Sequence, residues 1–476
     1  MRFYGREEEL QTLSNFLQIV RKKHLSQMVA VTGRRRVGKT TLILKAFEKE
    51  KDAVPVFYFF VERRTTEEEL VAAWLADVCR AYDVEFPPAV RTVAELMRYL
   101  MALSRQKECV CIIDECQDFN LIAPGVWSQL QKVWDLNKNE SQMLLVMSGS
   151  ILSAMEQIFS DRSEPLYGRT SGLIEVKPFT PLIIKDIVRT EAPKASPEDL
   201  LFIYALTGGV AQYLTLLADS DRLTAEGALD YIFSMAGSWL RYEGEIYLTN
   251  EFKAESVTYH EILRAVTEGA TQWSEIENRL KTTAQLSPYL VRLERFGILK
   301  KLQPIFQEDN KRKTTKYAVA DPYFSFWLTF ITPPEPRRLA EAGNWEGAKD
   351  YCRRHLNEFL GKSLERWFIA DYRGDHRWNH VGGWWDKNGV NEIDLVAVNT
   401  DEKQLEIAEV KLNPRRYDEL KLRMKAEAFL QATSKFRDYA LTVRGLSPEN
   451  LWQEDPDDRG CIIQRARTLS PIGETI

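Results

Sequence analysis

Four residues near the start of the chain have the types and spacing of a phosphate-binding loop. Gly33, Gly38, Lys39 and Thr40 match the pattern G-x-x-x-x-G-K-[ST] in full, with an apolar strand expected before it and a helix after it. Glycines let backbone amides wrap a phosphate, and the helix N-terminus adds partial positive charge. We expect Lys39 to reach the β- and γ-phosphates and Thr40 to bind Mg²⁺; the alternative is a chance glycine turn. The residues expected to bind nucleotide in this segment are Gly33, Val37, Gly38, Lys39, Thr40 and Thr41.

An acidic pair follows an apolar run farther along the chain. Asp114 and Glu115 come directly after residues 110–113. Asp114 would hold Mg²⁺ through water, and Glu115 would polarise the attacking water as a general base. Alone, such a pair is only a helix N-cap signal. After a phosphate loop it predicts an ATPase rather than a GTPase, and no guanine-reading N-K-x-D pattern stands at the expected place.

A second group of charged residues near the other end of the chain has the pattern of a metal-dependent nuclease. Asp394 lies in one expected strand, Glu409 and Lys411 share a face of the next, and residues 399–403 make the turn. Pairing of the two strands would place the three side chains together. Carboxylates are hard ligands suited to Mg²⁺ or Mn²⁺, and a neighbouring Lys can orient a water. Glu365, on an upstream helix, would complete this metal site.

That second pattern is short, and it most often marks a solvated strand face. The apolar neighbours Ile393 and Leu395 favour a site, as does a basic helix behind the hairpin. Between Lys411 and Arg437 there are eight Lys or Arg against three Asp or Glu, although such a run is usually a solvated helix face. The candidate phosphate contacts on this helix are Lys421, Lys425 and Gln431.

Bulk properties set limits on these interpretations. The 476 residues are too many for one core, so about three domains are expected. A net charge of −5 does not indicate a nucleic-acid binder overall. The six cysteines form no CxxC pair, so a zinc site is not expected, and their use as small hydrophobes suits a reducing cytoplasm. No run of about 18 apolar residues predicts a membrane span.

Strands and helices alternate over the first third of the chain, which predicts a parallel α/β sheet with helices on both faces. The expected strands are residues 28–32, 54–61, 109–113 and 143–147. The expected helices are residues 6–23, 40–49, 66–82 and 93–105. Residues 182–219 also have a helical pattern, broken by Gly208 and Gly209.

The middle of the chain has the pattern of a winged-helix domain. Three short helices are expected at residues 259–266, 273–280 and 286–296. A hairpin of residues 297–299 and 317–319 follows, around a polar turn at 309–315. Winged helices bind DNA and also dock proteins, and the sequence leaves both alternatives open.

The remaining segments predict a linker and an α/β domain. Residues 332–336 have linker composition. A helix is then expected at 355–372, strands at 378–385, 392–398 and 405–411, a helix at 417–433 and a strand at 439–443. The expected divisions are an ATPase core (1–180), a helical lid (181–250), a winged-helix domain (251–332), a linker (333–354), a nuclease-like domain (355–450) and a tail (451–476).

The chain resembles the AAA+-related ATPases of the archaeal type over nearly its whole length. The opening at residues 3–10 resembles the motif that lies against the adenine, which implies nucleotide contacts for Gly5 and Arg6. The polar end of the fourth strand resembles the sensor of the γ-phosphate, a role for which Ser148 and Ser150 compete. Residues 208–214 resemble the lid motif, although Ala211 stands where proline is common. Residues 321–327 resemble the motif that closes the winged-helix region.

Two sets of arginines have further expectations, one from the family resemblance and one from the phosphate-loop pattern. Arg169 lies in a segment that resembles the Gly-Arg element, so it is a candidate for transition-state charge stabilisation, in cis or from a neighbouring subunit. The alternative for Arg169 is an ordinary salt-bridged surface residue. Arg34, Arg35 and Arg36 occupy positions that the phosphate-loop pattern leaves free, and we expect their charged groups to be solvated.

The resemblance also implies a companion C-terminal domain similar to PD-(D/E)xK nucleases. The sequence therefore predicts a protein that binds and hydrolyses ATP with Mg²⁺ and acts on or at DNA through a nuclease-like domain. The alternative is a slow nucleotide switch, for signalling or scaffolding, whose C-terminal domain binds without cutting. A remodeller of proteins is a third interpretation. The candidate partners besides ATP are DNA, a protein partner and a second copy of the chain.

Overall fold

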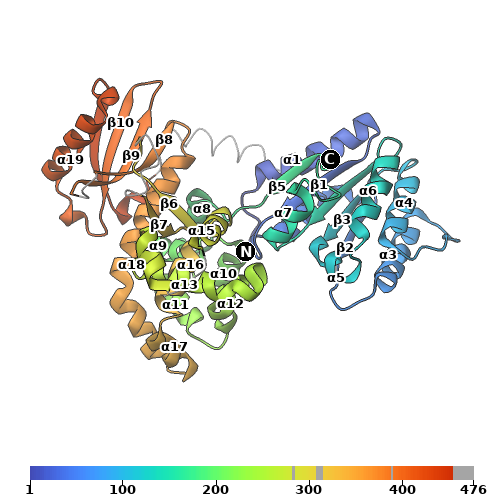
Figure 1. Cartoon of the computed structure of the whole chain (residues 1–476), viewed down its shortest axis with the longest axis horizontal. Coiled ribbons are helices and arrows are strands. Elements are labelled where there is room, and N and C mark those ends of the chain that lie inside the picture. The colour runs from blue at the N-terminus through green and yellow to red at the C-terminus, as the bar shows by residue number, and fades with distance from the viewer. Residues whose placement is uncertain (281–284, 307–314, 387–389, 454–476) are drawn as a thin grey trace, which may run out of the picture.

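The described chain has three regions that follow one another along the sequence. The computed structural model describes residues 1–280, 285–306, 315–386 and 390–453. Figure 1 shows an α/β region at one end (blue to teal), a helical region (green to yellow) and a C-terminal sheet at the other end (orange to red). Among the described residues, no helix combines the length and apolarity that a membrane-spanning segment requires.

The first region contains a five-stranded parallel sheet in the order β2-β3-β4-β1-β5, which confirms the predicted fold class. Its strands are β1 (Gln27–Thr32), β2 (Val56–Phe60), β3 (Cys109–Asp114), β4 (Met143–Ser148) and β5 (Gly172–Glu175). The central strands are almost wholly buried, as expected for strands that are covered on both faces. The sequence pattern did not predict β5, because it is a short edge strand with an exposed Leu173.

Helices cover both faces of this sheet. They are α1 (Glu7–Lys23), α2 (Lys39–Ala46), α3 (Glu67–Tyr82), α4 (Val93–Ser104), α5 (Phe119–Ile122), α6 (Val126–Asn137) and α7 (Leu152–Ser160). One apolar cluster lies between the sheet and α3, α4 and α6, and another lies between the sheet and α1 and α2. The helices α3 and α4 each begin with a capping box, at Thr66 and Thr92. A threonine three residues before a glutamate favours the start of a helix at these positions.

The helical region contains the predicted lid helices and winged-helix elements. Its helices and strands are α8 (Pro181–Glu191), α9 (Pro197–Thr207), α10 (Ala211–Asp219), α11 (Ala225–Ile232), α12 (Ser238–Phe252), α13 (Ser256–Thr267), α14 (Trp273–Leu280), α15 (Leu286–Arg295), β6 (Leu299–Leu302), β7 (Lys316–Val319) and α16 (Pro322–Phe330). The strands β6 and β7 pair as an antiparallel hairpin. Most of the polar turn predicted at 309–315 lies outside the described residues.

The winged-helix elements contact other parts of the same chain. Arg295 of α15 forms an ion pair with Glu156 of α7, with 2.6 Å between Nε and Oε1. Beyond β6, the Ile305 amide donates to the Gly383 carbonyl at 2.9 Å, and the Phe306 ring lies 5.1 Å from that of His380. In this arrangement the third helix contacts the first region of the chain, and the segment after β6 contacts the C-terminal sheet.

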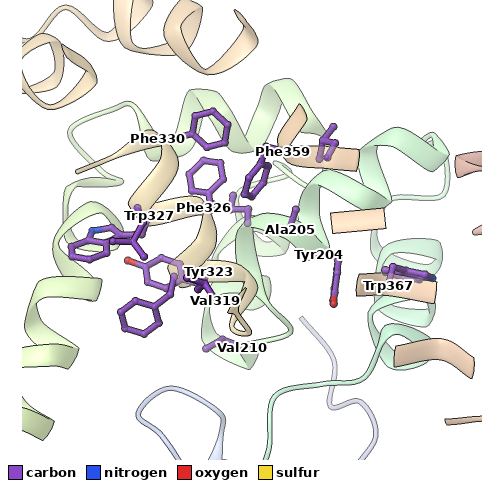
Figure 2. Packing of buried hydrophobic residues seen from close by; sticks show 14 of the residues in the cluster. Tyr204, Ala205, Val210, Val319, Tyr323, Phe326, Trp327, Phe330, Phe359 and Trp367 are labelled. Atoms are coloured by element: carbon purple, nitrogen blue, oxygen red, sulfur yellow. The ribbon is translucent and has the colours of Figure 1, made fainter. Parts of the chain in front are cut away.

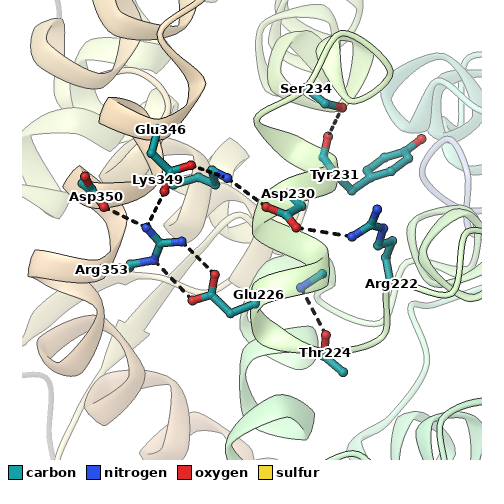
Figure 3. A network of polar contacts seen from close by, with 11 residues as sticks. Arg222, Thr224, Glu226, Asp230, Tyr231, Ser234, Glu346, Lys349, Asp350 and Arg353 are labelled. Carbon is teal, nitrogen blue, oxygen red and sulfur yellow. Dashed lines mark hydrogen bonds and ion pairs between the residues drawn. The ribbon is translucent and has the colours of Figure 1, made fainter.

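The segment with linker composition is helical. Its two helices are α17 (Pro334–Glu341) and α18 (Trp345–Gly374), so α18 begins ten residues before the predicted residue 355. Pro334 suits the first turn of a helix, which does not need its missing N–H. In α18, Ala348 and Cys352 are fully buried. Figure 3 shows α18 tied to α11, where Lys349 pairs with Asp230 at 2.9 Å and Arg353 with Glu226 at 2.8 Å.

The C-terminal region is a four-stranded mixed sheet in the order β11-β10-β9-β8. Its elements are β8 (His380–Trp385), β9 (Glu392–Asn399), β10 (Gln404–Val410), α19 (Glu419–Ala432) and β11 (Ala440–Leu446). The first three strands are antiparallel and β10 and β11 are parallel, so α19 is the crossover helix between them. One face of the sheet packs on α19.

The opposite face of that sheet joins an apolar core that continues into the helical region. The cluster includes residues of the lid helices, the winged-helix elements, α18 and the strands β9 and β10. Figure 2 shows part of it: the Tyr204 and Trp367 rings meet edge to face at 5.1 Å, and Phe326 meets Phe359 at 5.8 Å. The segments predicted as lid, winged helix and C-terminal domain therefore share one core.

Candidate functional site

The predicted phosphate loop connects β1 to α2 and encloses its own lysine. Gly33 (φ +145°) and Gly38 (φ +93°) have conformations that favour glycine, and a Cβ at Gly33 would lie 2.4 Å from the Val176 carbonyl oxygen. The Lys39 ammonium donates to the carbonyls of Gly33 at 2.7 Å and Arg34 at 3.0 Å. Burial lowers the pKa of Lys39 to about 8, against the opposing effect of nearby acids. A phosphate bound here would offer this ammonium a stronger acceptor.

Asp114 lies at the carboxyl end of β3 and receives three hydrogen bonds. Its Oδ2 accepts from the Thr40 hydroxyl at 2.6 Å and from the Tyr58 hydroxyl at 3.0 Å, and its Oδ1 accepts from the Glu115 amide at 3.0 Å. All of these donors are neutral. A hydroxyl and a carboxylate so placed fit the oxygen preference of Mg²⁺, so Thr40 and Asp114 would hold a nucleotide-bound ion.

Glu115 turns into the same space through a left-handed backbone conformation (φ +53°). Its Oε2 accepts from the Ser150 hydroxyl at 2.8 Å and from the Gln117 amide at 2.6 Å. The Ser148 hydroxyl is fully buried and has no hydrogen-bond partner among the described residues. Of the two serines that competed for the sensor role, Ser150 therefore faces Glu115.

An open cavity of ≈ 830 Å³ joins the phosphate loop to the N-terminal opening and the lid. It is lined by residues of the loop and α2 (Val37, Gly38, Lys39, Thr40, Thr41), by Glu115 and Ser150, by Phe3, Tyr4 and Arg6, and by Ala211 and Gln212 of α10. Gly5 is not among the lining residues; it packs close to Ile183. The cavity has the extent and the polar end that a nucleotide requires.

Arg6 connects three segments around this cavity. Its guanidinium donates to the carbonyls of Val37 at 3.3 Å and Lys177 at 2.6 Å, and it lies 4.6 Å from the centre of the Phe179 ring. Arg6 thus fixes the N-terminal opening against the phosphate loop.

The expectation of solvated arginines in the phosphate loop is wrong for two of the three. Arg34 is buried in an ion pair with Asp321, the residue that caps α16, and Asp321 raises the pKa of Arg34 although burial opposes this. Arg36 pairs with Glu243 of α12 at 2.9 Å and stacks on Trp239 at 4.3 Å. The loop is therefore tied to the helical region, while Arg35 is exposed as predicted.

Arg169 lies outside the cavity lining and is held by other groups. Its guanidinium forms two-pronged contacts with the Asp135 carboxylate, at 2.9 Å from Nη2 to Oδ2, and donates to the Pro165 carbonyl at 2.8 Å. This arrangement matches the salt-bridged alternative. Within the described single chain, Arg169 does not reach the phosphate loop.

In the C-terminal sheet the structure brings Asp394, Glu409 and Lys411 together. The Lys411 ammonium lies 3.3 Å from Glu409 Oε1 and 3.6 Å from Asp394 Oδ2. The Asp394 carboxylate also accepts from the Val410 amide at 2.8 Å. Lys425 of α19, expected on a solvated face, instead forms an ion pair with Glu409 at 3.0 Å and is largely buried.

The charges of this C-terminal group are distributed unevenly. Burial, together with Asp394 and Glu392, raises the pKa of Glu365 to about 7, and burial also raises the pKa of Asp394. Burial opposes ionisation of Glu409 too, but Lys425 and Lys411 hold its pKa below the usual range. No group of three His, Cys, Asp or Glu residues in the described ranges is arranged to hold a metal ion. At this site the carboxylates of Asp394 and Glu409 face lysines.

Four residues at these sites were not predicted from the sequence. Tyr58 and Gln117 contact the acidic pair, and Asp321 and Glu243 neutralise the loop arginines. Tyr58 interrupts an apolar strand with a polar group, which is a weak local signal. Asp321 and Glu243 are far from the loop in sequence, so no local pattern could have identified their role.

Comparison with known proteins relates two segments of the chain to families. Residues 3–217 match the model of an ATPase domain found predominantly in Archaea, and residues 327–422 match that of archaeal and bacterial proteins of unknown function. An uncharacterised protein of Methanocaldococcus jannaschii is 28% identical over 418 residues, covering 86% of this chain and 87% of the relative.

A solved structure has the same type of fold. A Walker-type ATPase of Pyrococcus abyssi is 21% identical, covers 68% of this chain and 96% of its own, and has a TM-score of 0.51. The ORC2 protein of Aeropyrum pernix, in ADPNP and ADP complexes, is 15% identical, covers 75% of this chain and 96% of its own, and has a TM-score of 0.47. The likeness to the first of these concerns the fold.

Proposed function

This chain joins an ATPase domain of the archaeal type to a C-terminal domain of unknown function, and from that premise we propose that it binds and hydrolyses ATP with Mg²⁺. The contact that carries the proposal is the 2.6 Å hydrogen bond between Thr40 and Asp114 beside the Lys39 loop. It lies beside the polar end of the cavity, which Lys39, Thr40 and Glu115 line.

The roles of the site residues follow from this geometry. The loop amides and Lys39 would bind the phosphates, and Thr40 and Asp114 would hold Mg²⁺, which neutralises phosphate charge when bound. Glu115 would accept the proton of the attacking water. In the described arrangement, Ser150 and Gln117 occupy one oxygen of Glu115, so that oxygen must exchange partners or leave the proton to the other.

Steady-state ATP hydrolysis of wild type and Lys39→Ala, with and without single- and double-stranded DNA, tests the proposal. We expect Lys39→Ala to lower turnover by about 100-fold or more, because it removes a charged donor to the phosphates. Lys45→Ala is the matched control, since Lys45 also borders the cavity but pairs with the exposed Glu48. Equal turnover in wild type and Lys39→Ala would reject the proposal.

The alternative function, a nucleotide switch, is favoured by the loop arginines. Arg34 pairs with Asp321 at the start of α16, and Arg36 pairs with Glu243 of α12. The helix α16 in turn contacts α18, where the Arg366 guanidinium donates to the Ser325 hydroxyl at 2.9 Å. Glu365, one of the acidic residues of the C-terminal site, directly precedes Arg366 in the sequence. Connected polar contacts thus run from the nucleotide site to the C-terminal region, although a connection of this kind is not itself a measured coupling.

We further propose that the C-terminal region contacts nucleic acid. The supporting observation is the basic helix α19, which packs on the C-terminal sheet and leaves the candidate phosphate contacts Lys421 and Gln431 exposed. As arranged, Glu365, Asp394 and Glu409 do not form a metal-binding group, so no cleavage step is derived from them.

Comparison of ATP hydrolysis with and without DNA distinguishes these alternatives. Stimulation by DNA that is lost in Lys39→Ala supports an ATPase that acts at DNA. Slow turnover that is indifferent to DNA, with retained nucleotide, supports the switch and directs the search towards a protein partner. Incubation of labelled DNA with Mg²⁺ or Mn²⁺, in wild type and Glu409→Ala, tests cutting directly.

A further inference from the structure

Tyr58 reaches the nucleotide site from the edge of the sheet. The strand β2 pairs in parallel with β3, with Tyr58 beside Ile112 and Phe60 beside Asp114. Successive side chains of a strand point to opposite faces. Phe57 and Phe59 are buried in the apolar cluster with α3, whereas Tyr58 is 40% exposed on the face towards α2. Its long side chain reaches forward along the strand direction to the carboxyl end of β3.

The phenol makes a specific contact there. Its hydroxyl donates to Asp114 Oδ2 at 3.0 Å, the same oxygen that accepts from Thr40 at 2.6 Å.

Thr40 and Tyr58 differ in what else their hydroxyls would do. The Thr40 hydroxyl donates its proton to Asp114, and its oxygen would also be a ligand of Mg²⁺, so its position would depend on the ion. Tyr58 has no such second role in the described structure. It can therefore keep Asp114 oriented in both states of the site.

We propose, on the basis of the ATPase function above, that Tyr58 is a positioning residue that holds Asp114 for binding of the Mg²⁺-nucleotide. Tyr58 itself touches neither nucleotide nor ion in this proposal. It acts through the Asp114 carboxylate, so its effect depends on Mg²⁺.

Tyr58→Phe tests the proposal because it removes only the hydroxyl. Binding of a fluorescent ADP analogue is measured with Mg²⁺ and with EDTA, together with thermal unfolding of the protein without nucleotide. We expect the ratio of the two affinities to fall by about 10-fold, with affinity in EDTA unchanged, because one hydrogen bond to a charged group is lost. We expect KM for ATP to rise by a similar factor while kcat changes less than about two-fold, because the lost hydrogen bond acts on binding of the Mg²⁺-nucleotide.

Tyr82→Phe is the matched control, because Tyr82 packs against the same strand through Phe57 while its hydroxyl donates to the Lys107 carbonyl at 2.9 Å. An unchanged affinity ratio in Tyr58→Phe overturns the inference and leaves the ATPase function intact. Equal losses in Mg²⁺ and EDTA, or a lowered unfolding temperature without nucleotide, also overturn it, because they indicate a structural role. Absence of Mg²⁺-dependent binding in wild type would reject the ATPase function and this inference together.

Discussion

The two acidic sites of this chain differ in what faces their carboxylates. At the nucleotide site, Asp114 and Glu115 accept from hydroxyl and amide groups, and the nearest ammonium, that of Lys39, donates to loop carbonyls instead. At the C-terminal site, Lys411 and Lys425 lie 3.3 and 3.0 Å from one oxygen of Glu409. A carboxylate held by neutral donors keeps its full charge towards a cation, whereas a cation at the second site would meet repulsion from two ammonium groups. This difference supports assigning the first site to a nucleotide-bound metal ion.

The substitution with the largest expected effect is Glu115→Gln, which tests the role of Glu115 at the nucleotide site. We expect ATP turnover to fall by about 100-fold or more, since the general base is lost while the hydrogen bonds of the side chain can be replaced by those of an amide. ATP should still raise the unfolding temperature of the variant. Turnover close to that of wild type would show that Glu115 is not the base.

Breaking the arginine anchor of the phosphate loop should have the next largest effect. Arg34→Ala leaves Asp321 as an unpaired buried charge, so we expect a loss of about 3–5 kcal/mol in the free energy of unfolding. Arg35→Ala, one residue away on an exposed side chain, should change it by less than about 0.5 kcal/mol. Urea denaturation of both variants measures the difference. Similar values would contradict the role assigned to the Arg34 ion pair.

A smaller effect should mark the C-terminal site. The pKa of Glu365 is raised to about 7 by burial and neighbouring acids, so the folded protein binds a proton that the unfolded chain releases near pH 4.5. Its contribution to stability is full below that value and is lost as pH rises through about 7. Glu365→Gln should therefore be about 1–3 kcal/mol more stable than wild type at pH 8, with little difference at pH 4.

The control for this measurement is Glu358→Gln on the same helix, where the carboxylate is exposed and pairs with Lys362. Its stability should follow that of wild type at each pH. A pH profile of Glu365→Gln parallel to wild type would mean that Glu365 ionises normally.

Local patterns predicted the first site better than they predicted its surroundings. The phosphate loop, the strand that ends in Asp114 and the flanking helices each follow from spacing within a few residues. The helix α12 was not predicted as an element, because buried polar residues such as Glu243 interrupt its apolar pattern. Glu243 is buried because it meets Arg36 of the phosphate loop, about 200 residues away in sequence, and one sequence cannot reveal such a partner.

The C-terminal region shows the same limit in another form. Alternation along the strands is enough to predict that Asp394, Glu409 and Lys411 lie together. Lys425 was expected on a solvated face because a helix pattern does not show which turn of the helix lies over the sheet. The predicted linker failed for a similar reason, since prolines that often mark extended chain also suit the first turn of a helix.

The long helix α18 limits where this chain can be divided into separately folding parts. Its first turns pack on α11 and its last turns carry the C-terminal sheet, with Leu364, Trp367 and Phe368 buried between them. A chain divided at residue 355 would split this helix and expose an apolar surface on both products. We therefore expect the helical region and the C-terminal sheet to unfold together, as one cooperative unit.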